Sequence, residues 1–372
     1  MKFTIEKDVF LKCLSKLQGI VEKRSTMPIL SNSLLRVLKG ELEVTATDLE
    51  VTVLDRCEIS SSEPGSITLS AKKLYEIVRE LPEGPLELRS KEDNWVEIKS
   101  GKNLFELVGL GSEEFPKVPE ISQYSLMELD AAVLKQMVEK TIYASAGEES
   151  RYSLNGIFLE KSEDKKGLRM AATDGHRLAV IDREIEPAAK MQLEKGVILP
   201  RKGMAEVKKI LEGVDGKVQF GIKDNSAAVK TNATVVFMRL IDGEFPEYRR
   251  VIPEPGERKK KVSIAREDFQ RTLRRASLLV DERARAVKFS LSSNLLVMEG
   301  KNPGLGTSHG ECEVEYKGDK VEIGFNDRYF MDILAVTSSD KIKLEIKDEL
   351  SPVMVLPDDD SRYFCIVMPM RL

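Results

Sequence analysis

The chain repeats one short pattern three times, and this internal repeat limits the folds that it can adopt. Each copy opens with a short alternating strand, followed by a segment with apolar residues at intervals of three and four. Such spacing places one apolar stripe along a helix that packs against a core. The three openings are Phe3–Ile5 with Phe10, Leu14, Leu17 and Val21; Met127–Leu129 with Val133, Leu134, Met137 and Val138; and Val262–Ile264 with Phe269, Leu273, Ala276 and Val280.

A second strand and helix follow in each copy, and the rest of the copy is rich in Val, Ile, Leu and Thr, which favour strands. This composition predicts an α+β fold of three similar domains, each with antiparallel sheet and two helices. The second pairs are Ile67–Leu69 with a helix over Ala71–Leu81, Val197–Leu199 with Lys202–Leu211, and Val321–Ile323 with Asp327–Val336.

Short matching motifs connect the first two copies and mark the domain boundaries. Ala46-Thr47-Asp48 corresponds to Ala172-Thr173-Asp174. Glu114-Phe115-Pro116 corresponds to Glu244-Phe245-Pro246, and both lead into proline-containing stretches that we interpret as linkers. The linkers lie near Pro116–Tyr124 and Ile252–Lys260, so we expect domains over residues 1–123, 124–255 and 256–372.

The bulk composition is that of a soluble globular protein, with 41% hydrophobic and 32% charged residues in 372. The sequence has no apolar run long enough for a bilayer, and its first residues lack the apolar core of a signal peptide, so we expect a cytoplasmic protein. The four cysteines, Cys13, Cys57, Cys312 and Cys365, are far apart and form no metal-ligand pair. We therefore expect free thiols, no metal site and no cofactor.

The faces opposite the apolar stripes carry positive charge in several of the predicted helices. A cationic helix face can follow phosphates without reading bases, although a solvated surface is the alternative. The net charge of −4 argues only weakly against nucleic acid, because binding depends on where the charge lies. The sequence shows no zinc-finger spacing, basic zipper or run of aromatic residues, so any DNA contact should be electrostatic and sequence-independent. The basic residues are Lys12, Lys16, Lys72, Lys73, Arg79, Arg201, Lys202, Lys208, Lys209, Arg266, Arg271, Arg274 and Arg275.

The search for a catalytic site finds one weak pattern. Asp174 precedes His176 by two residues, which is compatible with a catalytic pair. The intervening Asp-Gly step favours a turn, however, and the first copy has Leu49-Glu50 at the matching place. The sequence contains no G-x-S-x-G motif and no phosphate-binding loop. We therefore expect no enzyme, and a hydrolase that uses Asp174 and His176 is the alternative.

Three longer motifs resemble one family, the bacterial DNA polymerase III beta subunits, which are sliding clamps. The motifs are Ala172–Val180, Leu240–Pro253 and Val367–Leu372, supported by Arg24–Leu30 and Leu199–Gly203. The resemblance covers essentially the whole chain.

The resemblance implies three similar domains per chain and two chains that close head to tail as a ring, the DNA clamp fold. The ring surrounds duplex DNA without sequence preference and tethers the replicative polymerase as a processivity factor. It is a non-catalytic subunit of the DNA polymerase III holoenzyme, and a separate loader opens it. The implied partners are the polymerase III alpha subunit, the clamp loader and other replication and repair polymerases, which dock short peptides into one pocket per chain. No membrane partner is implied.

The resemblance also implies three sets of site residues. The partner-peptide pocket is lined by Leu154, Thr173, Gly175, His176, Arg177, Leu178, Pro246, Arg250, Val251, Leu350, Ile366, Met368, Pro369, Met370 and Arg371. The DNA-binding residues are Arg24, Arg79, Arg151, Tyr152, Lys202 and Lys209, and the dimer seam includes Lys73, Phe105, Leu278 and Leu279. Flexible methionines suit a groove that accepts many peptides, and the three arginines of the pocket could pair with acidic or polar peptide atoms. Ordinary core packing is the alternative for Leu154, Leu178 and Ile366.

Two regions depart from the family pattern. Glu148 and Glu149 lie in a loop that the resemblance places near DNA, where they would repel phosphate. The segment Asn302–Glu313 contains glycines and is less acidic than the resemblance implies for a ring seam, which weighs against salt bridges there. A sequence-independent DNA-binding scaffold that does not close into a ring is the second alternative.

Overall fold

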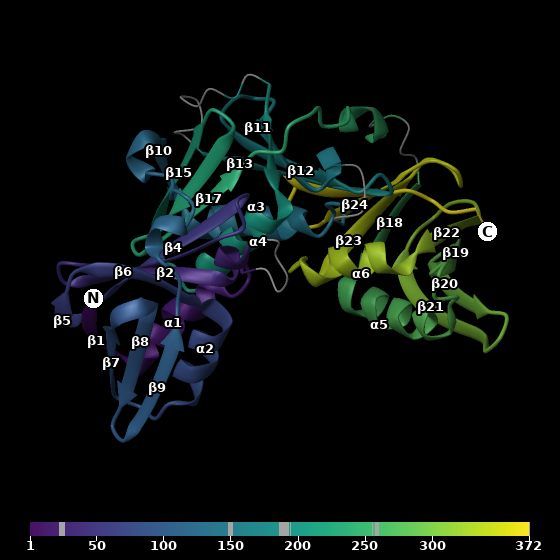
Figure 1. Cartoon of the computed structure of the whole chain (residues 1–372). Helices are drawn as coiled ribbons and strands as arrows, with labels where there is room; N and C mark the ends of the chain where they lie inside the picture. Colours follow the sequence, from purple (N-terminus) through teal and green to yellow (C-terminus); the bar gives the residue numbers. More distant parts are fainter. Residues whose placement is uncertain are drawn as a thin grey trace. The chain divides into compact units, whose positions relative to one another are not determined.

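The computed structural model describes residues 1–21, 27–147, 152–185, 193, 195–254, 256 and 260–371. Their contacts form two compact units (Figure 1). Unit 1 contains Met1–Lys135 and Lys202–Leu240, and unit 2 contains Gln136–Arg201 and Ile241–Leu372. The units do not follow the three predicted segments because β-sheets continue from one segment into the next. The predicted domain boundaries therefore stay a prediction.

Each repeat contributes two α-helices to the described part of the chain, as predicted. Two helices end earlier than the apolar stripes suggested, so that Val21 and Val280 lie outside them. The first helix ends at Leu17 because Gly19 follows, where a Cβ would lie 2.3 Å from Glu206 Oε1. The helices are α1 (Lys7–Leu17), α2 (Ala71–Glu80), α3 (Ala131–Ile142), α4 (Arg201–Ile210), α5 (Arg266–Ala276) and α6 (Asp327–Ala335), and the short 3-10 helix η8 (Ser277–Leu279) follows α5.

Unit 1 contains two antiparallel sheets. Helices α1 and α2 pack against strands of the first repeat in both sheets. The five-stranded sheet has the order β5 (Ser60–Glu63), β1 (Lys2–Glu6), β7 (Pro85–Ser90), β8 (Trp95–Ser100) and β9 (Asn103–Val108). The eight-stranded sheet has the order β10 (Ser125–Asp130), β15 (Lys217–Lys223), β16 (Ser226–Lys230), β17 (Thr234–Arg239), β4 (Val51–Glu58), β3 (Glu41–Thr47), β2 (Asn32–Leu38) and β6 (Gly65–Ser70).

Unit 2 contains one long antiparallel sheet of twelve described strands. Their order is β14 (Val197–Pro200), β11 (Gly156–Lys161), β12 (Gly167–Thr173), β13 (Arg177–Glu184), β25 (Tyr363–Val367), β24 (Val353–Pro357), β23 (Lys341–Ile346), β18 (Lys260–Ala265), β21 (Gly306–Glu315), β20 (Leu295–Asn302), β19 (Ala286–Ser292) and β22 (Val321–Asn326).

Two strand pairs join the repeats, and both have the same register. Strand β17 of the second repeat pairs with β4 of the first, and β25 of the third pairs with β13 of the second. Thr234 lies opposite Asp55, and Tyr363 lies opposite Ile181. Both partner positions stand seven residues after the aspartate of the repeated Ala-Thr-Asp motif. The two junctions therefore share the same antiparallel strand register relative to the repeated motif.

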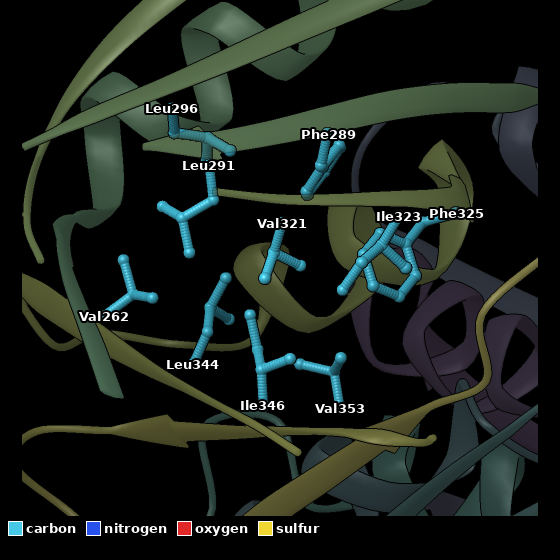
Figure 2. Close-up of a pocket in the computed structure, with 10 residues that line it drawn as sticks. All are labelled: Val262, Phe289, Leu291, Leu296, Val321, Ile323, Phe325, Leu344, Ile346 and Val353. Atoms are coloured by element: carbon cyan, nitrogen blue, oxygen red, sulfur yellow. The ribbon is translucent and has the colours of Figure 1, made fainter. Parts of the chain in front are cut away.

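The core of unit 2 is packed around four aromatic rings. Phe269, Phe289, Phe325 and Phe330 contact one another with ring centroids 5.1 to 5.8 Å apart. Beside them lies a cavity of about 20 Å³, lined only by apolar side chains (Figure 2). A cavity of this size without polar groups does not hold ordered water. It is a packing defect of the core and provides no group that could bind a polar ligand.

Candidate functional site

A tight turn between β12 and β13 forms the centre of the candidate site. The Asp174 Oδ1 atom accepts the backbone N–H groups of His176 at 3.0 Å and Arg177 at 3.1 Å. Thr173 Oγ1 accepts the N–H of Gly175 and donates to the Arg177 carbonyl. Gly175 has a φ of +91°, which favours glycine, and the Asp-Gly turn predicted from sequence is confirmed.

The geometry of this turn gives no support to a catalytic pair. The second carboxylate oxygen of Asp174 accepts the Arg177 Nε donor at 3.0 Å. The His176 ring instead stacks on Tyr329, with centroids 6.4 Å apart and planes within 10°. A carboxylate that acts with histidine must orient its imidazole, and Asp174 orients the backbone and an arginine. The hydrolase alternative therefore lacks its geometric basis.

Arg177 is a buried clamp, with only 8% of its surface exposed. Besides Asp174, its guanidinium donates to Asp332 Oδ2 and to the Tyr143 carbonyl, both at 2.6 Å. It lies over the rings of Tyr143 and Tyr329. Burial opposes the charged form, but the hydrogen bond to Asp332 and the nearby carboxylates raise the Arg177 pKa above its usual value. Each of its three nitrogens already donates to a group of the chain, so this geometry gives no support to a pairing of Arg177 with an incoming peptide, which stays a prediction.

The C-terminal segment lies directly beside this turn. Leu178 of β13 is opposite Ile366 of β25. Beyond β25, the N–H of Met368 donates to the His176 carbonyl at 2.9 Å, and the N–H of Met370 donates to the Gly324 carbonyl at 2.8 Å. The structure thus brings together Thr173–Leu178 and Met368–Arg371, which are far apart in sequence.

The predicted segment Pro246–Val251 reaches the same place through a cluster of apolar residues. Tyr248, in the 3-10 helix Tyr248–Val251, packs in one buried cluster with Leu178 and Ile366. Phe245 stacks on Phe158 at 4.9 Å between centroids and covers the cluster edge. Leu178 and Ile366 are therefore buried core residues, which agrees with the packing alternative.

The remaining predicted pocket residues differ in exposure. Leu154 is buried in the 3-10 helix Tyr152–Leu154, and Leu350 is exposed in the turn after β23; neither belongs to the cluster. Thr173 is buried by its role in the turn. Half-buried or exposed side chains that a partner could reach are those of His176, Pro246, Arg250, Val251, Leu350, Met368, Pro369, Met370 and Arg371.

Three residues of the site were not found from the sequence. Tyr329 and Asp332 lie three apart on α6, so they share the helix face that contacts His176 and Arg177. Tyr143 follows α3 and supplies a carbonyl. The sequence does show that Tyr329 and Asp332 share one face of a predicted helix. It does not show that this face contacts the turn at Arg177, which lies about 150 residues earlier.

The predicted DNA-binding residues lie on helix faces whose cations are paired with acids. Arg79 contacts Glu80, and Lys209 contacts Glu206. Lys202 contacts the almost fully buried Asp48, and Tyr152 is exposed. Arg24, Arg151, Glu148 and Glu149 lie outside the described residues. These helix faces are thus basic but partly neutralised.

The predicted seam residues divide between the two units. Phe105 lies on β9, the last strand of its sheet, and is exposed. Lys73 lies on α2 and pairs with Glu76 at 2.8 Å. Leu278 and Leu279 form η8, where Leu278 is 76% exposed.

Three equivalent α+β repeats with basic helix faces are typical of a non-catalytic scaffold of the DNA clamp class. Models of the three domains of the DNA polymerase III beta subunit match residues 1–119 (N-terminal), 128–247 (central) and 249–371 (C-terminal). The chain belongs to the DNA polymerase III beta subunit family. It is accordingly a DNA clamp with a role in processivity and not an enzyme.

Individual relatives cover the chain from end to end. The beta sliding clamp of Pseudomonas aeruginosa is 36% identical over 378 residues, and that of Escherichia coli is 33% identical over 373, each with 100% of both chains covered. The crystal structure of a Bartonella birtlesii sliding clamp bound to griselimycin has 34% identity, a TM-score of 0.94 and full coverage of both chains. The beta subunit of Thermotoga maritima has 30% identity and a TM-score of 0.90, with 100% of this chain and 99% of that chain covered. The family and α+β fold inferred from sequence are confirmed.

The buried Arg177 clamp predicts a stability effect that is separate from peptide binding. Arg177→Ala would leave Asp174 and Asp332 without their cation, so we expect a loss of about 3 kcal/mol of unfolding free energy. Arg250→Ala is the matched control, because Arg250 is exposed and pairs with Glu247 at the surface, which should contribute less than about 0.5 kcal/mol. Urea unfolding followed by circular dichroism measures both, and equal midpoints for the two variants would contradict the clamp.

Proposed function

We propose that two copies of the chain close head to tail into a ring around duplex DNA. The observation that carries the proposal is the repeated junction, in which the last strand of one repeat pairs with a hairpin strand of the repeat before it. Within the described residues, the corresponding last strand of the first repeat, β9, pairs on one side only. The corresponding hairpin strand of the third repeat, β21, pairs with β18 only through Ser263 and Ile264. These two free edges fit each other across two copies, and a heterologous contact can close into a ring.

The internal junctions predict the register of this third junction. Thr234 and Tyr363 are the first residues of β17 and β25, and Asn103 is the first residue of β9. On the other side, Asp55 lies opposite Val44 and Ile181 lies opposite Met170, each four residues before the aspartate of the repeated motif. In the third repeat, Met298 holds this place four residues before Asn302, and it lies opposite Gly310. Asn103 of one copy therefore aligns with Gly310 of the next.

This register places the predicted seam residues close to one another. With Asn103 opposite Gly310 in antiparallel strands, Phe105 lies opposite Ser308. The Ser308 hydroxyl donates to the Ala276 carbonyl, and η8 follows Ala276 directly, so Leu278 and Leu279 lie close to that position. Phe105, Leu278 and Leu279 would thus form the apolar centre of the seam, whereas Lys73 stays in it on the family resemblance alone.

Replacing Leu278 and Leu279 together with Ala should produce folded monomers. Both residues lie in η8, beyond the end of α5, so the core that α5 packs against should persist. Burial worth about 1.5–3 kcal/mol per leucine would be lost at each of the two seams. Sedimentation velocity at submicromolar concentration measures the state. A double variant that remains dimeric would refute the seam, and a wild-type chain that is monomeric would favour the scaffold that does not close.

For the DNA-facing surface, we infer that helices α1, α2 and α4 with Arg79, Lys202 and Lys209 line the ring. Arg24, Arg151 and Tyr152 belong to this set by resemblance. A surface of paired cations holds phosphates weakly and without preference for position, which suits sliding. The proposed location is the cytoplasm, where a separate loader would open the ring. None of the described helices is long and apolar enough to cross a membrane.

Affinity for short linear duplex should be weak and steeply dependent on salt. If about five phosphates are neutralised, log K should fall with a slope near −4.5 against log salt. Clamps loaded on closed circular DNA should stay there and leave when the circle is cut. Loss at equal rates from both forms would count against topological tethering. Arg79→Ala is the clean charge variant, since Lys202→Ala would also leave the buried Asp48 without its partner.

The site around His176 and the C-terminal segment is proposed as the pocket for partner peptides. Half-buried methionines beside an aromatic ring offer adaptable apolar area, and the buried floor of Leu178, Ile366 and Tyr248 keeps the groove in shape. Arg250 and Arg371 are the exposed cations of the predicted set that could meet acidic or polar peptide atoms. The DNA polymerase III alpha subunit, the clamp loader and other replication and repair polymerases are the proposed partners.

Deleting Met368–Leu372 should weaken binding of a polymerase-derived peptide at least tenfold. The deletion removes two methionines, and burial of one such side chain is worth about 1.5–3 kcal/mol, where about 1.4 kcal/mol is a factor of ten. Isothermal titration measures the affinity. Sedimentation of the truncated chain is the control, because the dimer should remain. An unchanged affinity in a dimeric truncation would remove the pocket assignment.

A further inference from the structure

One apolar surface is not used by the DNA-facing helices, the docking site or the seam centre. Trp95, Leu104 and Val108 are 44%, 58% and 61% exposed, and they lie on the same face of β8 and β9, opposite the face that packs on the core. Beside them is a hollow of about 440 Å³ lined by Lys91, Glu92, Trp95 and Glu106. An exposed apolar patch with a polar rim is typical of an interaction surface.

Two of the three charged residues that line this hollow are paired with each other. Lys91 Nζ contacts Glu106 at 2.7 Å, and it also contacts Glu97 at 2.6 Å. An apolar side chain can therefore enter beside this pair without separating it, and the methylene groups of Lys91 add apolar area to the wall. The hollow fits an uncharged apolar group better than a second ion.

The two internal junctions show what covers the corresponding face. The second and fourth residues of β17, Val235 and Phe237, belong to an apolar cluster with Ile121 and Tyr124. The second and fourth residues of β25 are Phe364 and Ile366, which belong to the cluster with Leu178 and Tyr248. In β9 these places are held by Leu104 and Glu106. At each internal junction, an apolar cluster thus covers the face of the sheet that carries the second and fourth residues of the last strand. The same face of β9 is exposed.

The register of the ring junction brings one apolar residue to this face. With Asn103 opposite Gly310, Val108 lies opposite Leu305. Leu305 is the last residue of the turn of the β20–β21 hairpin, where its N–H donates to the Asn302 carbonyl, and its surface is 75% exposed. In the junction of β13 and β25, the equivalent places are held by His176 and Met368, which are joined by a backbone hydrogen bond.

We propose that Leu305 of one copy inserts into the hollow beside Trp95 and Val108 of a second copy and forms the apolar outer half of the ring seam. The inference rests on the proposed ring closure. It adds a contact on the face of the sheet opposite to Phe105, since neighbouring residues of a strand point to opposite faces. The contact also agrees with the composition of Asn302–Glu313, which has few acidic residues for salt bridges. A seam in this segment would then be held by apolar contact.

Trp95 reports on this contact directly, because it is the only tryptophan of the chain. Wild-type protein is diluted through its dimer–monomer transition, and sedimentation and tryptophan emission are recorded on the same samples. We expect a blue-shifted emission in the dimer that is lost on dissociation. Leu305→Ser should abolish the shift and weaken each seam about tenfold, hence the dimer about a hundredfold, since a ring of two chains has two seams.

Two further variants make the test specific. Leu49→Ser is the matched control, because Leu49 is an exposed leucine at the tip of the corresponding β3–β4 hairpin, and it should change neither dimer affinity nor emission. Val108→Ser should weaken the dimer less in the Leu305→Ser background than alone, as expected for residues in contact. A wild-type dimer whose affinity and emission are unaffected by Leu305→Ser would overturn this contact and leave the ring standing. A chain that forms no dimer would overturn both.

Discussion

Pairing between the free edges of β-strands is the constraint on which the rest of this structure depends. An unpaired strand edge presents N–H and C=O groups that invite further pairing, and natural sheets must cover, charge or complete such edges. Here β4 accepts β17 and β13 accepts β25 in one register, so each repeat completes the sheet of the one before it. The repeats are therefore linked by their backbones, and side chains at these positions can vary while the junction persists. This explains how the three copies can differ so much in sequence yet keep one architecture.

The proposed docking site depends on a second interaction, the buried guanidinium of Arg177. A buried charge is tolerated only when paired, and Arg177 meets Asp174, Asp332 and the Tyr143 carbonyl. These partners come from the turn after β12, from α6 and from the end of α3. One side chain therefore fixes three elements around the groove, and it leaves His176 and the methionines of the C-terminal segment as the parts that can adapt.

The sequence predicted the fold well where periodicity carries the information. The second helix of each repeat begins within one residue of the position expected, and the Asp-Gly turn is as predicted. Helix ends were less accurate, since Gly19 stops α1 through a close approach to Glu206 that only the folded chain reveals. The site was harder still. The resemblance named Arg177 and Leu178, but their roles as clamp and floor depend on partners such as Asp332 and Tyr248, which are remote in sequence.

Surface charge and surface apolarity serve different ends in this molecule. Arg79, Lys202 and Lys209 of α2 and α4 are paired with Glu80, Asp48 and Glu206, so the positive charge that they present to a polyanion is partly neutralised. Weak electrostatic contact without base contacts sets no preferred position along DNA, so firm retention would come from closure of the proposed ring. Closure requires specificity, which apolar side chains such as Phe105 and Leu278 would supply in the proposed seam, because they fit only against a complementary edge. Weak contact with DNA would thus allow sliding, and selective contact between two copies would keep the clamp on the DNA.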